Sequence, residues 1–172
     1  LKTYNTVSSQ DICFIQDMDY AEYIKKKTGV EIRSGDIVNR SGVVLGRHKG
    51  IPFYTIGQRR GLGIAYSEPL YVTGIDVQNN RLIVGVKEDV LKNGVIVDRL
   101  NWIAIEGING PMRVTARIRY NQPKAKATIS SMGDDLVRVD FDQPVEAPAP
   151  GQAAVFYNRN VVLGGGWIRE VV

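Results

Sequence analysis

The sequence is poor in the residues that build disulfides and metal sites. Its 172 residues include one cysteine, Cys13, and one histidine, His48. A single cysteine excludes an internal disulfide framework and fits a reducing compartment. One cysteine and one histidine are also too few to build a Cys/His zinc site. We therefore expect no bound metal ion and a cytoplasmic location.

Long hydrophobic stretches and nucleotide-binding motifs are missing as well. No apolar run approaches the ~20 residues that a membrane-spanning helix needs. The first residues contain no hydrophobic signal core, and no Walker loop or complete dinucleotide fingerprint occurs anywhere in the chain. The chain does not begin with Met, so we expect it to be part of a longer protein.

Acidic residues are absent from two long stretches, which gives the net charge of +4 a distinct pattern. Residues 37–67 and residues 107–133 contain arginine and lysine but no aspartate or glutamate. Patches of one charge sign suit a polyanion such as a nucleic acid. The alternative is a solvated surface whose charges are balanced by acids elsewhere in the fold. Charge alone leaves both interpretations open.

The single cysteine lies within residues 9–15, which read Ser-Gln-Asp-Ile-Cys-Phe-Ile. The local context favours a buried structural thiol, because Ile12 and Phe14 flank it and free cysteine is among the most buried residue types. The alternative is a thiol at the lip of a pocket, since polar residues precede it. A thiol is the one side chain here that could act as a strong nucleophile, or carry sulfur, without a cofactor. Cys13 is therefore the candidate catalytic residue.

Hydrophobic periodicity predicts one helix and many short strands. The helix is expected over about residues 19–28, with Asp19 as N-cap and Gly29 as C-cap. Elsewhere, short apolar runs and turn residues alternate every ~8–12 residues, which is typical of a sandwich or barrel. The expected strands lie at 36–38, 43–46, 70–75, 81–86, 101–105, 112–120, 125–130, 136–141, 153–157 and 161–168.

Residues 112–120 form the clearest predicted strand, because apolar and polar side chains alternate along it. The apolar set is Val114, Ala116, Ile118 and Tyr120, and the polar set is Arg113, Thr115, Arg117 and Arg119. The arginines of one face are then spaced ~6.6–7 Å apart, which roughly matches successive phosphates of a nucleic-acid backbone. The strand is therefore a candidate nucleic-acid contact.

These patterns predict a mainly β protein, with a composition shift at residues 65–69 as the domain boundary. Residues 1–13 would form a linker that carries the cysteine segment. Residues 14–66 would form a small, β-rich central domain that carries the helix. Residues 67–172 would form a C-terminal antiparallel β-barrel. Near the end of the central domain, residues 57–63 hold three glycines and the pair Arg59 and Arg60, which is a weak signal for backbone approach to a phosphate or a neighbouring chain.

Several separated segments together resemble the family of tRNA-specific 2-thiouridylases. The cysteine segment resembles that of the family, and the further blocks follow in the family's order over nearly the whole chain. They are residues 54–63, 80–85, 118–120, 150–157 and 163–166. Six separated matches are far more specific than a single motif.

The resemblance implies an ATP-dependent sulfurtransferase that replaces the C2 oxygen of the wobble uridine of certain tRNAs with sulfur. It implies that Cys13 carries the persulfide and that Arg119, Tyr120 and Gln152 contact tRNA. It also implies that the C-terminal barrel resembles a barrel of translation elongation factors. The charge pattern adds four weaker candidates for tRNA binding, which are Arg113, Arg117, Arg59 and Arg60.

The chain also departs from the family pattern. It contains no ATP loop of the Ser-Gly-Gly-x-Asp type and no second cysteine. ATP with Mg would therefore be bound by an N-terminal domain of the parent enzyme, and we expect this portion to bind no cofactor and to be inactive alone. The implied partners are tRNA and a persulfide donor, either a sulfur-relay protein or a cysteine desulfurase, with no membrane and no DNA.

Two other functions fit parts of the pattern. A non-catalytic RNA-binding β-barrel module with a structural Cys13 would explain the basic patches but not the cysteine segment. A protein-interaction domain fits less well, because arginine-lined strands with few exposed aromatics favour polyanions. One site residue and one glycine segment also have structural alternatives. Gln152 follows Pro150-Gly151 and can serve as a turn residue, and residues 164–166 (Gly-Gly-Gly) can serve as a bend or a close backbone approach.

Overall fold

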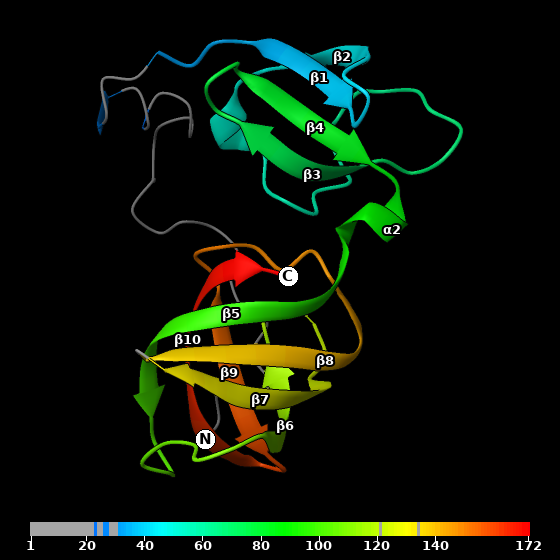
Figure 1. Ribbon diagram of the computed structural model, residues 1–172. Coiled ribbons are helices and arrows are strands. Elements are labelled where there is room, and N and C mark those ends of the chain that lie inside the picture. Colours follow the sequence, from blue (N-terminus) through cyan, green and yellow to red (C-terminus); the bar gives the residue numbers. More distant parts are fainter. Residues whose placement is uncertain (1–22, 24–25, 28–30, 121, 134) are drawn as a thin grey trace, which may run out of the picture.

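The computed structural model describes residues 23, 26–27, 31–120, 122–133 and 135–172, and it consists of two β units (Figure 1). A four-stranded sheet, here called the sheet unit, precedes a closed six-stranded barrel. The predicted fold class, a mainly β protein with a small β-rich unit and an antiparallel barrel, is confirmed. The strands are β1 (Gly35–Asn39), β2 (Val44–His48), β3 (Tyr71–Asp76), β4 (Arg81–Gly85), β5 (Leu91–Trp102), β6 (Met112–Arg117), β7 (Ala125–Gly133), β8 (Leu136–Glu146), β9 (Ala153–Asn158) and β10 (Val161–Val171).

The sheet unit has the strand order β2-β1-β4-β3. Both of its hairpins, β1–β2 and β3–β4, are antiparallel, whereas β1 and β4 pair in parallel. The first turn forms because the Asn39 side chain accepts hydrogen bonds from the backbone N–H groups of Ser41 and Val43, at 3.0 and 2.9 Å. Gly42 follows with a positive φ of 82°, which glycine adopts without steric cost.

A long loop between β2 and β3 completes the sheet unit. It begins with a short 3-10 helix, η1 (Ile51–Phe53), and then lies along the outer edge of β3. The N–H of Gly57 donates to the Val72 carbonyl at 2.7 Å, and the N–H of Val72 donates to the Gln58 carbonyl at 2.9 Å. The loop therefore satisfies backbone groups that an open sheet edge would leave unpaired.

The core of the sheet unit combines strand and loop residues. Ile37, Val72, Leu82 and Val84 are buried on the strands, and three loop residues pack against them: Tyr54, Leu62 and Leu70. His48 is the one buried polar side chain among the described residues, with 1% of its surface exposed. Its Nε2 lies 3.0 Å from the Asn80 carbonyl, and its Nδ1 accepts the N–H of Gly50 at 3.0 Å. A neutral ring that donates through Nε2 satisfies both contacts.

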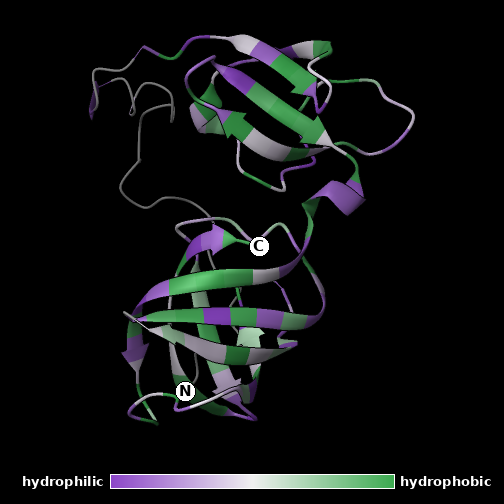
Figure 2. Cartoon of the chain, viewed as in Figure 1, coloured by the Kyte–Doolittle hydropathy of each residue, from purple (hydrophilic) through white to green (hydrophobic). Residues whose placement is uncertain are grey.

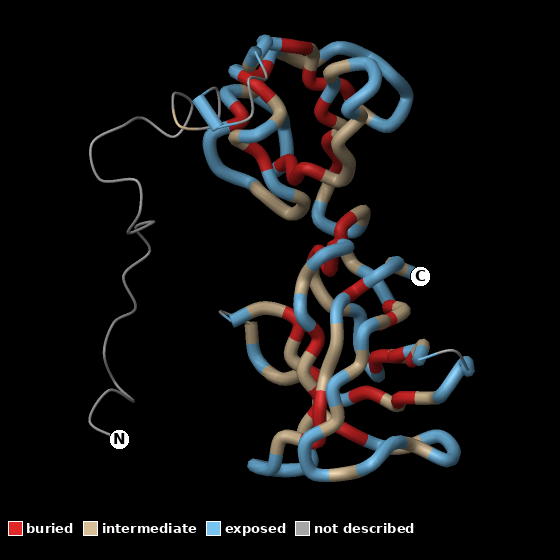
Figure 3. The backbone as a smooth tube through the Cα atoms, turned by 90° about the vertical axis from the view of Figure 1, so that its left-hand side faces the viewer, coloured by how far each residue is buried: buried red, intermediate tan, exposed pale blue. Residues whose placement is uncertain are grey.

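The barrel closes in the order β10-β5-β8-β7-β6-β9, and every strand pair is antiparallel. Apolar and polar residues alternate along its strands, as the hydropathy colouring shows (Figure 2). The apolar residues line one interior core in which Phe156, Ile129, Val95 and Val139 are fully buried. Figure 3 shows the same pattern as burial, with the exposed residues concentrated in turns and loops. The strand expected at 136–141 is part of β8, and its alternating residues Val137, Val139 and Phe141 are buried in this core.

The structure divides the chain later than the sequence pattern did. The hairpin β3–β4, which we had assigned to the barrel, pairs with β1 of the sheet unit. The short helix α2 (Lys87–Val90) then leads into β5, the first barrel strand. The physical reason is the parallel β1–β4 pairing, which is a long-range contact that the local composition at residues 65–69 does not encode.

Three further expectations differ from, or lie outside, the structure. Tyr120 is 76% exposed rather than inward, because β6 ends at Arg117. The expected strand at 101–105 coincides with β5 only at Asn101 and Trp102, because β5 starts at Leu91 and ends at Trp102. The predicted helix at 19–28 lies mostly outside the described residues, although Tyr23, Lys26 and Lys27 are helical. No helix in the described part of the chain is long and apolar enough to span a bilayer.

Candidate nucleic-acid interface

Strand β6 points its arginines away from the barrel core. Val114 and Ala116 are buried inside, while Arg113, Thr115 and Arg117 lie on the outer face, as the alternation predicted. Arg113 is already paired: its Nη1 donates to Asp142 at 2.7 Å and to the Thr128 hydroxyl at 3.1 Å. The hydrogen bonds between the two side chains lower the pKa of Asp142 and raise that of Arg113. The Arg113 charge is therefore largely balanced within the barrel.

Neighbouring basic side chains on the barrel are partly engaged as well. The Lys124 ammonium lies 3.7 Å from the ring centroid of Tyr157 and 3.4 Å from the Arg159 carbonyl. The Nε of Arg117 is buried and has no hydrogen-bond partner among the described atoms. Arg117 therefore differs from Arg113, because no carboxylate in the described residues forms an ion pair with it.

Arg119 lies where the two units meet, rather than on an open face. Its Nη2 donates to the carbonyl of Ile56 at 2.9 Å and to the carbonyl of Ala147 at 2.8 Å. The first acceptor belongs to the loop of the sheet unit, and the second follows β8 of the barrel. Burial lowers the pKa of Arg119, while the negative charge of Glu146 raises it in part. The side chain is thus half-buried and engaged in both units.

The segment around Ala147 also receives the two glutamines near the predicted site. Gln122 donates from Nε2 to the Glu146 carbonyl at 3.0 Å, and Gln152 accepts the N–H of Ala149 at 3.1 Å through Oε1. The structure therefore brings Arg119 and Gln152 to one short segment, although they are far apart in the sequence. The contact of Gln152 is that of a turn residue, which is the alternative that its sequence context offered. Tyr120, which directly follows Arg119 in the chain, is exposed to solvent.

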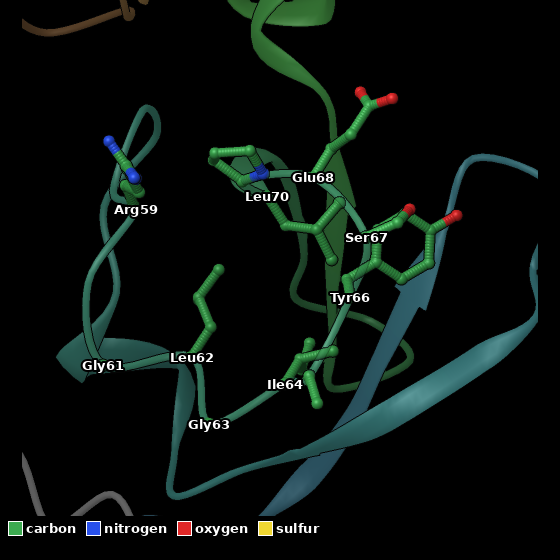
Figure 4. Close-up of a pocket in the computed structure, with 11 residues that line it drawn as sticks. Arg59, Gly61, Leu62, Gly63, Ile64, Tyr66, Ser67, Glu68 and Leu70 are labelled. Carbon is green, nitrogen blue, oxygen red and sulfur yellow. The ribbon is translucent and has the colours of Figure 1, made fainter.

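Arg59 and Arg60 lie on the exposed loop that follows Ile56. Neither forms an ion pair within the described part of the chain. Arg59 lines an open hollow of about 630 Å³, with Tyr66 and Glu68 on its opposite side (Figure 4). Gly61 and Gly63 form the rim of the hollow with positive φ values of 78° and 67°. Two exposed guanidinium groups that have no carboxylate partner among the described residues can contact a phosphate.

The glycine clusters do not fit a nucleoside triphosphate. A Cβ at Gly164 would lie 2.6 Å from the Asn101 carbonyl oxygen, and one at Gly165 would lie 2.4 Å from the Ala154 carbonyl oxygen. These glycines therefore permit the close strand packing of β10, as the sequence alternative proposed. The loop that contains Gly61 and Gly63 leads into no helix, so it lacks the helix N-terminus of a phosphate-binding loop.

Cys13, the predicted persulfide carrier, lies outside the described residues. The described residues also contain no cluster of His, Cys, Asp or Glu that could hold a metal ion. Sequence reasoning missed the acceptors of Arg119, the carbonyls of Ile56 and Ala147. The one signal in the sequence was Gly57 next to Ile56, because glycine is the common residue where the backbone approaches another segment closely.

Comparisons with protein families match the two units separately. Residues 21–86 match the tRNA methyl transferase PRC-barrel domain, and residues 92–168 match the aminomethyltransferase beta-barrel domain. The border between the matches falls at α2, where the structure also passes from the sheet unit to the barrel. The fold and the matches therefore define the chain as the PRC-barrel and β-barrel portion of a family of tRNA-modifying enzymes.

Full-length relatives narrow this class to one family. The chain is 46% identical to the tRNA-specific 2-thiouridylase MnmA of Symbiobacterium thermophilum, with 99% of this chain and 44% of the relative covered. It is 42% identical to the enzyme of the same name from Clostridium botulinum (100% and 48% covered) and 41% identical to that from Clostridioides difficile (99% and 47%). The chain belongs to the family of tRNA-specific 2-thiouridylases, and it spans about half the length of these relatives.

Proposed function

We propose that this chain is the sulfur-accepting and tRNA-docking portion of an ATP-dependent tRNA-uridine 2-sulfurtransferase. The observation that carries the proposal is the match to 2-thiouridylases along the full 172 residues, which includes the cysteine segment. The basic loop around Arg59 and Arg60 supports the docking role, since its guanidinium groups have no ion-pair partner within the described chain.

Cys13 accepts sulfur from a persulfide donor in this proposal. The Cys13 thiolate attacks the terminal sulfur of the donor persulfide, R–S–SH. A new S–S bond forms at Cys13, the S–S bond of the donor breaks, and the donor leaves as the thiolate R–S⁻. The number of S–S bonds is unchanged, so the step needs no external oxidant. The donor is a sulfur-relay protein or a cysteine desulfurase.

Activation of the uridine C2 oxygen requires ATP, and none of the glycine segments among the described residues forms a nucleotide-binding loop. The adenylation step therefore belongs to an ATP-binding domain, and this portion by itself does not complete the thiolation. Its own contribution is to carry sulfur on Cys13 and to hold tRNA. Tyr120, which is exposed beside the Arg119 contacts, offers a ring on which an unpaired base can stack.

Mass spectrometry of the intact chain tests the sulfur role. The chain is incubated with a cysteine desulfurase, its relay protein and cysteine, and we expect a mass gain of one sulfur atom that is absent in Cys13→Ala. If the wild-type chain gains no sulfur but binds tRNA, the portion is a docking module in which Cys13 is structural, which is the second candidate function.

Salt-dependent tRNA binding tests the docking role. If Arg60 contacts a phosphate, Arg60→Ala should lower the slope of log K against log salt by about 0.7–0.9. Arg138→Ala is the matched control, because Arg138 is already paired with Asp140 at 2.8 Å and should leave the slope unchanged. Equal slopes for all three proteins would reject a phosphate contact at Arg60.

A further inference from the structure

Ala147 takes part in several of the contacts between the sheet unit and the barrel. Its N–H donates to the Val90 carbonyl at 2.7 Å, and its carbonyl accepts Nη2 of Arg119 at 2.8 Å. Its side chain is 2% exposed and packs with Tyr71 and Val90, and Ile56 of the loop lies against the same cluster. Ala147, which directly follows β8, thereby contacts strand β3 and the loop of the sheet unit, and also the helix α2 that connects the two units.

Arg119 closes this contact from the barrel side. One nitrogen, Nη2, carries two hydrogens, and each of them points to a carbonyl in a different unit. Arg119 itself is half-buried, so its guanidinium reaches these two carbonyls from inside the contact between the units. A charge-assisted hydrogen bond is stronger than a neutral one, and a planar guanidinium holds its two acceptors in a fixed direction. Arg119 therefore links Ile56 to Ala147 with defined geometry.

Gly57 shows how closely the two units approach. A Cβ at Gly57 would lie 2.4 Å from the Ala147 Cβ and 3.5 Å from Arg119 Nη1. Its φ of +83° also disfavours any residue with a side chain. A glycine at this position allows the loop to reach Ala147, and the loop continues directly into Arg59 and Arg60.

We propose that Arg119 is a positioning residue, which locks the sheet unit onto the barrel by joining the carbonyls of Ile56 and Ala147. The two hydrogen bonds form without RNA, so the lock does not depend on a contact between Arg119 and RNA. It holds the loop with Arg59 and Arg60 in a fixed relation to Tyr120 on the barrel. Its value for tRNA recognition rests on the proposed function, because a long RNA that touches both units gains from their being pre-organised.

Distance measurements on the full chain test the lock without RNA. Spin labels are attached at Val77→Cys in the sheet unit and Met132→Cys in the barrel, both exposed positions, in a Cys13→Ser background. Pulsed electron paramagnetic resonance should give one narrow distance distribution. We expect Arg119→Met, which keeps the aliphatic stem but loses both donors, to broaden or shift the distribution. Arg60→Met is the control for loss of one positive charge, and it should leave the distribution unchanged.

Two more variants separate the lock from a general loss of stability. Arg119→Lys should restore part of the narrow distribution, since an ammonium can donate to both carbonyls although its stem is shorter. Gly57→Ala should broaden the distribution while Arg119 is intact, because the added methyl pushes Ala147 away. A wild-type distribution in Arg119→Met would overturn the proposal, and so would one in Gly57→Ala.

The salt dependence of tRNA binding distinguishes the lock from a phosphate contact. If Arg119 positions the units, Arg119→Met weakens binding with little change in the slope of log K against log salt. A slope lowered by about 0.7–0.9, together with an unchanged spin-label distribution, would show a phosphate contact instead. If the wild-type chain does not bind tRNA, the proposed function fails, whereas the distance measurement still decides the role of Arg119.

Discussion

The barrel and the sheet unit bury their cores in different ways. The barrel pairs each of its six strands with two neighbours, and fourteen buried residues fill its interior. The sheet unit is open, and its core holds seven buried residues. Three of these seven, Tyr54, Leu62 and Leu70, come from the loop between β2 and β3 rather than from strands.

The difference teaches where each unit can tolerate change. Closure removes the edges of the barrel, so its outer face can carry charged residues that do not affect the core. In the sheet unit the loop has two tasks, because it covers the edge of β3 and also presents Arg59 and Arg60. In the sheet unit, the same loop therefore contributes to stability and presents the basic residues. In the barrel, the charged residues of the outer face are separate from the core that stabilises it.

The largest effect is expected from Phe156→Ala, which opens a cavity in the barrel. Phe156 is fully buried and its ring lies 6.0 Å from that of Trp102. Loss of such a side chain costs about 4 kcal/mol of unfolding free energy. Both tryptophans, Trp102 and Trp167, are in barrel strands, so denaturant unfolding followed by tryptophan fluorescence reports on this unit.

Val161→Ala is the matched control in the barrel, because Val161 is 54% exposed and its truncation should change little. Hydrogen exchange of residues 81–85 measures the sheet unit in the same samples. If residues 81–85 lose as much protection as the barrel does in Phe156→Ala, the two units unfold together, and the distinction between their cores does not hold.

Leu82→Ala should destabilise the sheet unit by about 3 kcal/mol, because Leu82 is fully buried in its smaller core. The expected result is faster hydrogen exchange in residues 71–85, with the tryptophan-monitored transition of the barrel less affected. Val77→Ala, at a position that is 74% exposed, serves as the reference. A shift of the tryptophan transition as large as that of Phe156→Ala would contradict the separation.

His48→Phe tests the polar contact in the core of the sheet unit. The substitution keeps an aromatic ring but leaves the Gly50 N–H and the Asn80 carbonyl without their partner. The expected loss is about 2 kcal/mol, the cost of unsatisfied buried polar groups. Thermal unfolding of this variant is compared with that of Lys49→Ala, whose exposed side chain makes no contact of this kind. A variant as stable as the wild type would show that water replaces the ring nitrogens.

The smallest effect is the pH dependence from two surface aspartates, one in each unit. Hydrogen bonds from Asn79 lower the pKa of Asp76 in the sheet unit, and hydrogen bonds from Arg113 lower that of Asp142 in the barrel. A carboxylate with a lowered folded-state pKa stabilises the fold above its unfolded pKa. That stability is lost as the pH falls through the folded-state value, below about pH 4.

Melting curves between about pH 5 and pH 3 measure this effect. Asp142→Asn should flatten the pH dependence of the barrel transition, and Asp76→Asn should flatten that of the sheet unit. A pH dependence in Asp142→Asn as steep as in the wild type would show that the Arg113 contact adds nothing to stability in solution.

The sequence by itself determined the elements whose signals are local. The alternation of Val137, Val139 and Phe141 identified β8, because side chains of a strand point to opposite faces at a period of two. The strands at 36–38 and 43–46 were equally readable, and the turn between them is local as well, since the Asn39 side chain bonds to backbone groups within four residues. Family membership also followed from the sequence, because several short blocks in a fixed order are specific together.

Only the tertiary structure decided how these elements meet. The hairpin β3–β4 joined the sheet unit through a parallel contact with β1, and no property of residues 65–69 signals that partner. Arg119 looked like a member of an arginine row, yet its hydrogen bonds reach carbonyls that lie 63 and 28 positions away in the chain. Backbone carbonyls are identical at every residue, so a sequence pattern cannot show which of them a guanidinium will find.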